Sequence, residues 1–158
     1  METASQAYPL TKFEFEGNVL TVKYRETTKF DDYPGVECDV YDFVGDNSMD
    51  LGIIRIDPGC KTPRQKVLKG DRTVEGFVGG NGMLIIENEN GHCRACPVYS
   101  QMELPFSTEV EIGDVMQWRA DIDSALTVYE ICKPKYKDGR YTNLPEEVEA
   151  SKHVLPKP

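Results

Sequence analysis

This chain of 158 residues has only two histidines, one tryptophan and five cysteines. No uninterrupted apolar segment approaches the roughly 20 residues that a membrane-spanning helix needs. The N-terminal sequence METASQAYPLTK has no basic segment followed by an apolar run, so it does not resemble a secretory signal. An odd number of cysteines argues against a fully paired extracellular framework. We therefore expect a cytoplasmic protein with reduced thiols and no membrane partner.

Basic residues are also outnumbered. The chain has 18 Lys and Arg against 27 Asp and Glu, which gives a net charge of −9. Such a charge repels nucleic-acid phosphates, so we expect no nucleic-acid partner. A chain of this length fits one domain that buries most of its apolar surface without disulfides or metals. We predict a single domain over residues 1–158, with its core at about 13–134 and a tail at 135–158.

Several motifs that would indicate an enzyme class are missing. The sequence contains no GxGxxG in a βαβ setting, no GxxxxGK[ST], no GxSxG and no HExxH. His92-Cys93-x-x-Cys96 is the one cysteine motif, and without a second pair it is a weak zinc or redox signal. In a regular strand, Cys93 and Cys96 would also face opposite sides.

What the chain does contain is short apolar runs broken by Gly and Pro. Residues 50–82 read as strand, Pro-Gly corner, charged strand, Lys-Gly-Asp turn, strand and glycine-rich hairpin. Residues 13–24 alternate around Gly17-Asn18 and predict a hairpin. Frequent breaks of this kind favour a small antiparallel barrel or sandwich.

The remaining segments extend this pattern. We predict a polar loop at 25–37, a GDNS turn at 45–48, and a C-terminal helix, LPEEVEASKHV, capped by Asn143 or Leu144. The count of roughly nine or ten strands suits a jelly-roll barrel. Further strands are expected at 38–44, 51–56, 83–86, 92–104, 108–112, 115–119 and 125–132.

Residues 58–82 and 113–130 resemble the first and second conserved motifs of the cupin superfamily. The phrases that carry the resemblance are PGCKTPR, TVEGFVGGNG, VEIGDV and LTVYEICKP. With flanking strands it covers about residues 51–134. It implies an all-β double-stranded β-helix, the jelly-roll barrel of cupins, followed by a short C-terminal helix or tail.

The same resemblance indicates that the metal ligands of the superfamily are absent. Its two His positions fall on Gln65 and Val67, its Glu position on Thr73 and its last His position on Ser124. Divalent transition metals prefer imidazole, carboxylate or thiolate ligands. We therefore predict no metal and no other cofactor, which disfavours oxygenase and metal-dependent isomerase activities. The superfamily's metal-free epimerases depend on a barrel histidine, so this activity is also disfavoured.

Strand alternation then predicts which side chains face the barrel interior. If Gln65 and Thr73 point inward, so do Glu75 and Phe77. On the closing strand, inward Ser124 implies inward Leu126, Val128, Glu130 and Cys132. Carboxyl groups inside an apolar barrel are costly, and desolvation raises the carboxyl pKa toward the range of a general acid or base.

Glu75 and Glu130 are therefore the candidate catalytic residues. The alternative is that each forms an ion pair with an arginine such as Arg55, Arg64 or Arg72 and only ties strands together. Trp118 could line a site or simply fill the core, and Tyr129 should face outward. Arg64 and Lys66 could attract an anionic ligand at the mouth or could lie on a solvated face. The candidate substrate-binding residues are Arg55, Arg64, Gln65, Thr73, Phe77, Trp118 and Ser124.

Three functions remain open at this point. The favoured one is a metal-independent enzyme that binds a small molecule, for example an anionic or polyketide-like one, and catalyses its isomerisation, cyclisation or elimination by carboxylate acid/base chemistry. The second is a non-catalytic module that binds a small ligand. The third is a structural barrel that forms a homodimer through its N-terminal hairpin.

Overall fold

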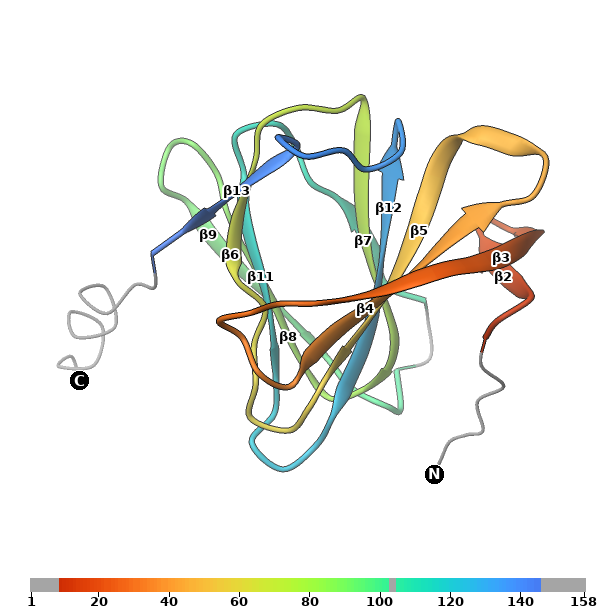
Figure 1. Cartoon of the computed structure of the whole chain (residues 1–158). Helices are drawn as coiled ribbons and strands as arrows, with labels where there is room; N and C mark the ends of the chain where they lie inside the picture. The colour runs from red at the N-terminus through yellow and green to blue at the C-terminus, as the bar shows by residue number, and fades with distance from the viewer. Residues whose placement is uncertain (1–8, 103–104, 146–158) are drawn as a thin grey trace, which may run out of the picture.

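All regular structure in the described part of the chain is β-strand. The computed structural model describes residues 9–102 and 105–145, which fold into two facing sheets (Figure 1). The strands are β2 (Lys12–Phe15), β3 (Asn18–Lys29), β4 (Val36–Phe43), β5 (Asp46–Ile56), β6 (Arg64–Val67), β7 (Arg72–Gly80), β8 (Gly82–Glu87), β9 (Cys93–Val98), β10 (Ser107–Glu109), β11 (Val115–Ala120), β12 (Leu126–Lys133) and β13 (Tyr141–Leu144).

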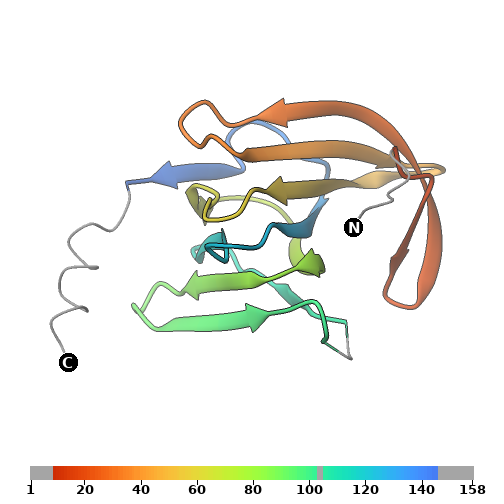
Figure 2. The same cartoon turned by 90° about the horizontal axis from the view of Figure 1, so that it is seen from below.

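The two sheets close into a jelly-roll barrel. One sheet has the order β10-β7-β12-β5-β4-β3-β2 and the other the order β13-β6-β11-β8-β9. Figure 2 shows the strands of the two sheets stacked one above the other. Strands distant in sequence are neighbours, as β12 is of both β5 and β7. The predicted all-β jelly-roll class is confirmed.

Turn chemistry explains why the chain reverses so often. The hairpin of β2 and β3 turns at Glu16-Gly17, where both residues have positive φ, 52° and 80°. Glycine adopts this backbone conformation without strain. The turn between β6 and β7 uses Gly70, at φ 121°, where a Cβ would lie only 2.6 Å from the Arg140 guanidinium. The predicted hairpin is confirmed, although its turn lies one residue earlier than the predicted Gly17-Asn18, and the Lys-Gly-Asp turn is confirmed as well.

Two apolar cores lie on opposite faces of the larger sheet. The inner core lies between the two sheets, and Leu126 and Val128 of β12 belong to it, as alternation predicts. The outer core contains Tyr129 and Ile131 of the same strand. Tyr129 therefore faces outward, which confirms its predicted direction.

The β2–β3 hairpin supplies the cover of the outer core. The rings of Phe13 and Phe15 meet the ring of Tyr129 edge-on, with centroids 4.9 and 6.3 Å apart. Gly76 on β7 leaves room for this ring, because a Cβ there would lie 2.1 Å from it. The hairpin thus packs on its own barrel.

Five local expectations need correction. The strands predicted at 92–104 and 108–112 are shorter, because β9 ends at Val98 and β10 ends at Glu109. The predicted loop at 25–37 is shorter, because β3 continues to Lys29 through polar, largely exposed residues. The predicted GDNS turn is also shorter, since β5 begins at Asp46. Asn143 and Leu144, expected to cap a helix, lie in β13 and pair with β6. The predicted helix itself lies outside the described residues.

The described residues contain no helix with the length and apolar character needed to cross a membrane.

Candidate functional site

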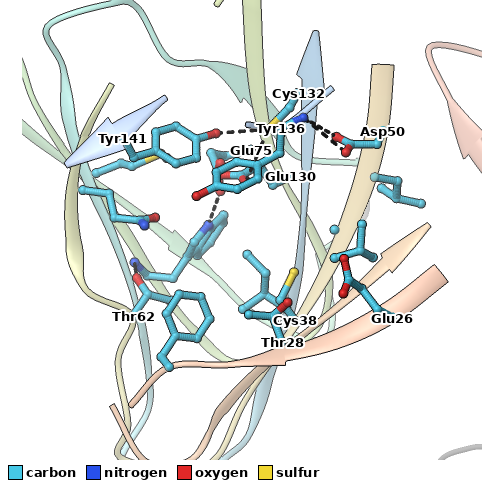
Figure 3. A pocket seen from close by; sticks show the side chains of 18 of the residues that line it. Glu26, Thr28, Cys38, Asp50, Thr62, Glu75, Glu130, Cys132, Tyr136 and Tyr141 are labelled. Atoms are coloured by element: carbon cyan, nitrogen blue, oxygen red, sulfur yellow. Dashed lines mark hydrogen bonds between the residues drawn. The ribbon is translucent and has the colours of Figure 1, made fainter. Parts of the chain in front are cut away.

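A cavity of about 210 Å³ opens between the two sheets, beyond the inner core. Typical ligand pockets have roughly 300–1,000 Å³. This cavity is therefore small compared with sites for drug-sized ligands. Figure 3 shows polar and aromatic side chains converging on it. Its lining residues are Arg25, Glu26, Thr28, Phe30, Cys38, Val40, Asp50, Leu51, Gly52, Ile54, Thr62, Gln65, Glu75, Met116, Gln117, Trp118, Glu130, Cys132, Tyr136 and Tyr141.

A pair of glutamates forms part of the cavity wall. Glu75 on β7 and Glu130 on β12 are direct cross-strand partners in the antiparallel ladder. A β-bulge between Thr127 and Val128 shifts the register further along, and the two glutamates lie on the regular side of it. Side chains of directly opposed residues lie on the same face, so both carboxyl groups point into the barrel (Figure 3).

Glu75 is the more deeply buried of the two, with 1% of its surface exposed. Its Oε1 accepts a hydrogen bond of 2.7 Å from Nε1 of Trp118. No hydrogen-bond donor of the described residues reaches its Oε2. The group that faces it is the Glu130 carboxyl, which can bond to Glu75 only when one of the two carries a proton.

This environment raises the pKa of Glu75 well above its ordinary value of 4.5. Desolvation is the largest cause, and the charge of Glu130 and the hydrogen bond with Glu130 act in the same direction. The hydrogen bond from Trp118 acts the other way and lowers the pKa. The pair therefore holds a proton on Glu75 under conditions in which an ordinary glutamate has lost it.

A second buried carboxylate lies nearby. Asp50 accepts hydrogen bonds from the backbone N–H of Tyr136, at 3.2 and 3.3 Å, and from Arg25, at 3.4 Å. Burial raises the pKa of Asp50, while the Tyr136 and Arg25 contacts lower it. Asp50 thus anchors the segment after β12, which carries Tyr136 over the cavity (Figure 3).

The thiols of the cavity are not activated. The Cys132 sulfur lies 3.1 Å from the Tyr141 hydroxyl and 3.7 Å from Glu130 Oε1. Burial is the main cause that raises the pKa of both Cys38 and Cys132, and the charge of Glu130 raises each further. Burial likewise raises the pKa of Tyr141. Because thiolates are the reactive form, neither cysteine has the features of a nucleophile.

Four of the predicted site residues meet at the cavity. Glu75, Glu130, Gln65 and Trp118 all line it. Gln65 donates a hydrogen bond of 3.3 Å to Asn143 on β13, which positions its amide. Trp118 is buried and serves both as wall and as hydrogen-bond donor.

Arg55 and Arg64, predicted to bind substrate, do not line the cavity. Arg55 shares the outward parity of Ile53, whereas Ile54 belongs to the inner core. It pairs instead with Asp39, at 2.8 Å, and Glu37, at 2.9 Å. Arg64 is turned toward Glu87 at 3.4 Å and toward the carbonyl of Pro145 at 2.8 Å.

Thr73, Phe77 and Ser124 also lie outside the cavity lining. Thr73 is buried, and its hydroxyl accepts a hydrogen bond of 2.9 Å from Arg140. Phe77 points inward but packs against the inner core. Ser124 precedes β12, and its hydroxyl accepts a hydrogen bond of 2.8 Å from Asn81, so the expected inward position is wrong.

No ion pair joins the two glutamates to an arginine within the described residues. Arg72, the third arginine considered, pairs with Glu16 and Glu109 instead. The purely structural role first considered for Glu75 and Glu130 therefore lacks the partners it requires.

Several lining residues were not predicted. Arg25, Cys38 and Asp50 come from strands before the recognised motifs, and Tyr136 and Tyr141 come from the segment after them. Inward parity relative to Ile54 could have indicated Asp50, which lies four residues earlier on β5. The position of Tyr141 follows from that of β13, for which the sequence gives little signal, and Tyr136 lies in the preceding segment that Asp50 anchors.

The four positions that correspond to the metal ligands of the cupin superfamily do not form a metal site in this chain. Of the four, only Gln65 reaches the cavity, since Val67 is buried in the inner core. Within 9–102 and 105–145, no group of three or more His, Cys, Asp or Glu side chains has the geometry of a metal site. On β9, Cys93 is exposed whereas Cys96 packs toward the inner core, so the two thiols face opposite sides.

The fold and cavity define a jelly-roll barrel with a carboxyl-lined interior. No protein-family model and no curated protein sequence matches the chain. Solved structures do match, and they show that the chain has the cupin fold. This confirms the fold that the sequence motifs implied.

Two bacterial cupin domains match over most of their length. A cupin-2 domain of Rhodospirillum rubrum matches with a TM-score of 0.57 and 13% identity, over 89% of this chain and 83% of that one. A cupin 2 conserved barrel domain protein of Rhodopseudomonas palustris matches with a TM-score of 0.55 and 12% identity, over 84% of this chain and 82% of that one.

Oxalate decarboxylase of Bacillus subtilis matches with a TM-score of 0.60 and 14% identity, in a variant with an E162A substitution. The match covers 82% of this chain but only 34% of that one. That enzyme has Mn(II) centres. At this identity the likeness shows the fold alone.

Proposed function

We propose that this protein is a metal-independent enzyme that binds a small organic molecule in the barrel cavity and moves a proton on it. The reaction class is isomerisation, cyclisation or elimination. The observation that carries the proposal is the buried Glu75–Glu130 pair, which faces a cavity and has no cationic partner among the described residues.

The pair supplies both halves of acid/base catalysis. Glu130 in its carboxylate form accepts a proton from one atom of the bound molecule. Glu75, protonated, donates its proton to a second atom or to a leaving group, so the pair ends with as many protons as it began with. General catalysts work best when their pKa lies near the working pH, and the pKa of Glu75 is raised in that direction.

The surroundings suit this chemistry. Trp118 fixes one oxygen of Glu75, so the carboxyl cannot rotate freely. The inner core, with Leu126 and Val128, limits water on one side. A shaped and partly dry site strengthens electrostatic effects on the reacting molecule.

Hydrogen–deuterium exchange at carbon tests the proposal without the natural substrate. The protein in D₂O is incubated with hydroxyacetone and with aminoacetone, and loss of the signals of protons next to the carbonyl is followed by NMR. We expect exchange above the buffer rate in the wild type, and a loss of at least about 100-fold in Glu75→Gln and Glu130→Gln, as is typical for removal of a general acid or base.

Glu14→Gln is the matched control, because it removes one charge from an exposed residue on β2. Exchange at the same rate in all four proteins would show that the glutamate pair does not catalyse. If the Gln variants bind these probes normally but no protein exchanges them, the non-catalytic binding module becomes the better account.

We also propose a homodimer. β2 is an edge strand of the larger sheet, and an unpaired edge can add a strand from another chain. Light scattering should give about twice the 17.8 kDa chain mass. A mass equal to one chain at micromolar concentration would exclude this arrangement.

A further inference from the structure

The charges around the cavity are strongly unequal. Four carboxyl groups line it, those of Glu26, Asp50, Glu75 and Glu130, against the single guanidinium of Arg25. The cavity is thus acidic beyond the general acidity of the chain.

Arg25 is already surrounded by acids. Its guanidinium lies 2.6 Å from Asp42, 3.4 Å from Asp50 and 3.7 Å from Glu26. Most of its charge is therefore compensated at the rim. Little positive charge is left to hold an anionic ligand against the two glutamates.

One buried carboxyl oxygen in the cavity wall lacks a hydrogen-bond donor among the described residues. Glu75 Oε2 is inaccessible to bulk water and receives no hydrogen bond from a donor group of the described residues. The proton held by the pair can lie between this oxygen and Glu130, and without that proton the buried oxygen has no donor among the described residues. A ligand that brings an N–H group to the cavity side of the pair, where Glu130 is the more accessible carboxyl, compensates this shortage of donors.

The apolar part of the wall favours the same kind of ligand. Four aromatic side chains line the cavity, those of Phe30, Trp118, Tyr136 and Tyr141. The faces of aromatic rings attract cations, especially where water is scarce. Carboxylates and aromatic rings together form a typical environment for an organic ammonium group.

We infer that the ligand of this cavity is a small organic cation, an amine that places its ammonium group against the Glu75–Glu130 pair. This deepens the proposed function and rests on the same cavity being the binding site. It reverses the anionic ligand suggested by Arg64 and Lys66, because the structure turns Arg64 toward Glu87. The volume of about 210 Å³ limits the ligand to a small molecule.

Binding of a cation should release a proton. The ammonium group favours ionised carboxylates, so part of the proton population held on Glu75 is released on binding, while the complexes in which Glu75 keeps its proton remain the reactive ones. The other titratable or charged groups that face the pair are Glu26, Asp50, Arg25, Cys38, Cys132, Tyr136 and Tyr141. The acids at Asp50 and Glu26 strengthen the effect, while Arg25 weakens it.

Fluorescence of Trp118 gives a direct test, because it is the only tryptophan of the chain and it contacts Glu75. The full chain is titrated with three probes of matched size, n-propylammonium, n-propanol and propionate, at pH 7. We expect affinity in that order, with the cation at least about tenfold tighter than the anion.

Calorimetry of the n-propylammonium titration in buffers of different ionisation enthalpy measures the proton release. In Glu75→Gln we expect the release to disappear and the preference for the cation to fall. The surface variant Glu14→Gln should keep both. Propionate binding as tightly as n-propylammonium, or no binding of any of the three, would overturn the inference.

The inference and the proposed function fail in different ways. If cations bind selectively but carbon exchange is unaffected in Glu75→Gln, the ligand class stands and the catalytic role falls. If exchange depends on both glutamates but the anion binds better, the catalytic role stands and the ligand class falls.

Discussion

Glu75 and Glu130 lie directly opposite each other on β7 and β12, and the nearest donor to the pair is the indole N–H of Trp118, 2.7 Å from Glu75 Oε1. Like charges in direct opposition are destabilising on a sheet. In a buried position they force one carboxyl to hold its proton. An arrangement that costs stability in this way is often found at functional sites.

The first prediction concerns stability and pH. The pKa of Glu75 is raised in the folded state, so its contribution is fully present below the ordinary value of 4.5 and is lost as pH rises through the folded pKa. We expect the free energy of unfolding in urea to fall over this range. In Glu75→Gln the free energy of unfolding should fall less steeply with pH. Its difference from the wild-type value can change by up to about 1.4 kcal/mol per pH unit.

Asp50 leaves a residual slope of the same sign in that variant, because its pKa is also raised. If plots of the free energy of unfolding against pH stay parallel for Glu75→Gln and wild type from pH 4 to 9, Glu75 does not hold the proton that we infer.

The second prediction concerns Trp118→Phe. The substitution removes the indole N–H that donates to Glu75 Oε1, so the pKa of Glu75 should rise further. Leaving a buried acceptor unbonded should cost about 1–3 kcal/mol in urea unfolding followed by circular dichroism. An unchanged stability and an unchanged carboxyl titration would mean that this hydrogen bond has little weight.

The third prediction concerns two glycines of β7. A Cβ at Gly76 would lie 2.1 Å from the Tyr129 ring, whereas a Cβ at Gly79 would meet nothing within 4 Å. Gly76→Ala should therefore displace the ring from the hairpin and cost about 1–3 kcal/mol. Gly79→Ala should change stability by less than about 1 kcal/mol. Equal thermal midpoints for the two variants would contradict the packing of the hairpin on Tyr129.

The fourth prediction concerns thiol reactivity. Cys93 is exposed, whereas Cys38 and Cys132 are shielded and burial raises the pKa of each. A thiol reagent should modify Cys93 first, and Cys93→Ser should remove the fast phase. Mass spectrometry of the modified chain identifies the site, and early modification of Cys132 would show that the cavity admits the reagent.

Much of the barrel could be predicted because Gly and Pro residues mark its turns in the sequence. Alternation then placed Glu75, Glu130 and Cys132 inward, since regular strands preserve side-chain parity. The same rule applied to Ile54 and Ile56 would have placed Arg55 outside. The family spacing misplaced Ser124, because the turn before β12 ends only at Leu126.

The other residues that line the cavity could not be predicted from the sequence, for a physical reason. β3 is exposed along most of its length, so Arg25 carries no alternation signal. β13 is held by pairing with β6 rather than by apolar periodicity, so Tyr141 looked like part of a tail. These positions depend on how the sheets curl and not on local pattern.

The most direct measurement is a ¹³C NMR titration of the glutamate side-chain carboxyls, with the Glu75 and Glu130 signals assigned by their Gln variants. The account predicts that Glu75 keeps its proton well above the pH range in which the surface glutamates lose theirs. It also predicts that n-propylammonium moves this titration to lower pH. A Glu75 signal that titrates together with the surface glutamates would contradict the central claim.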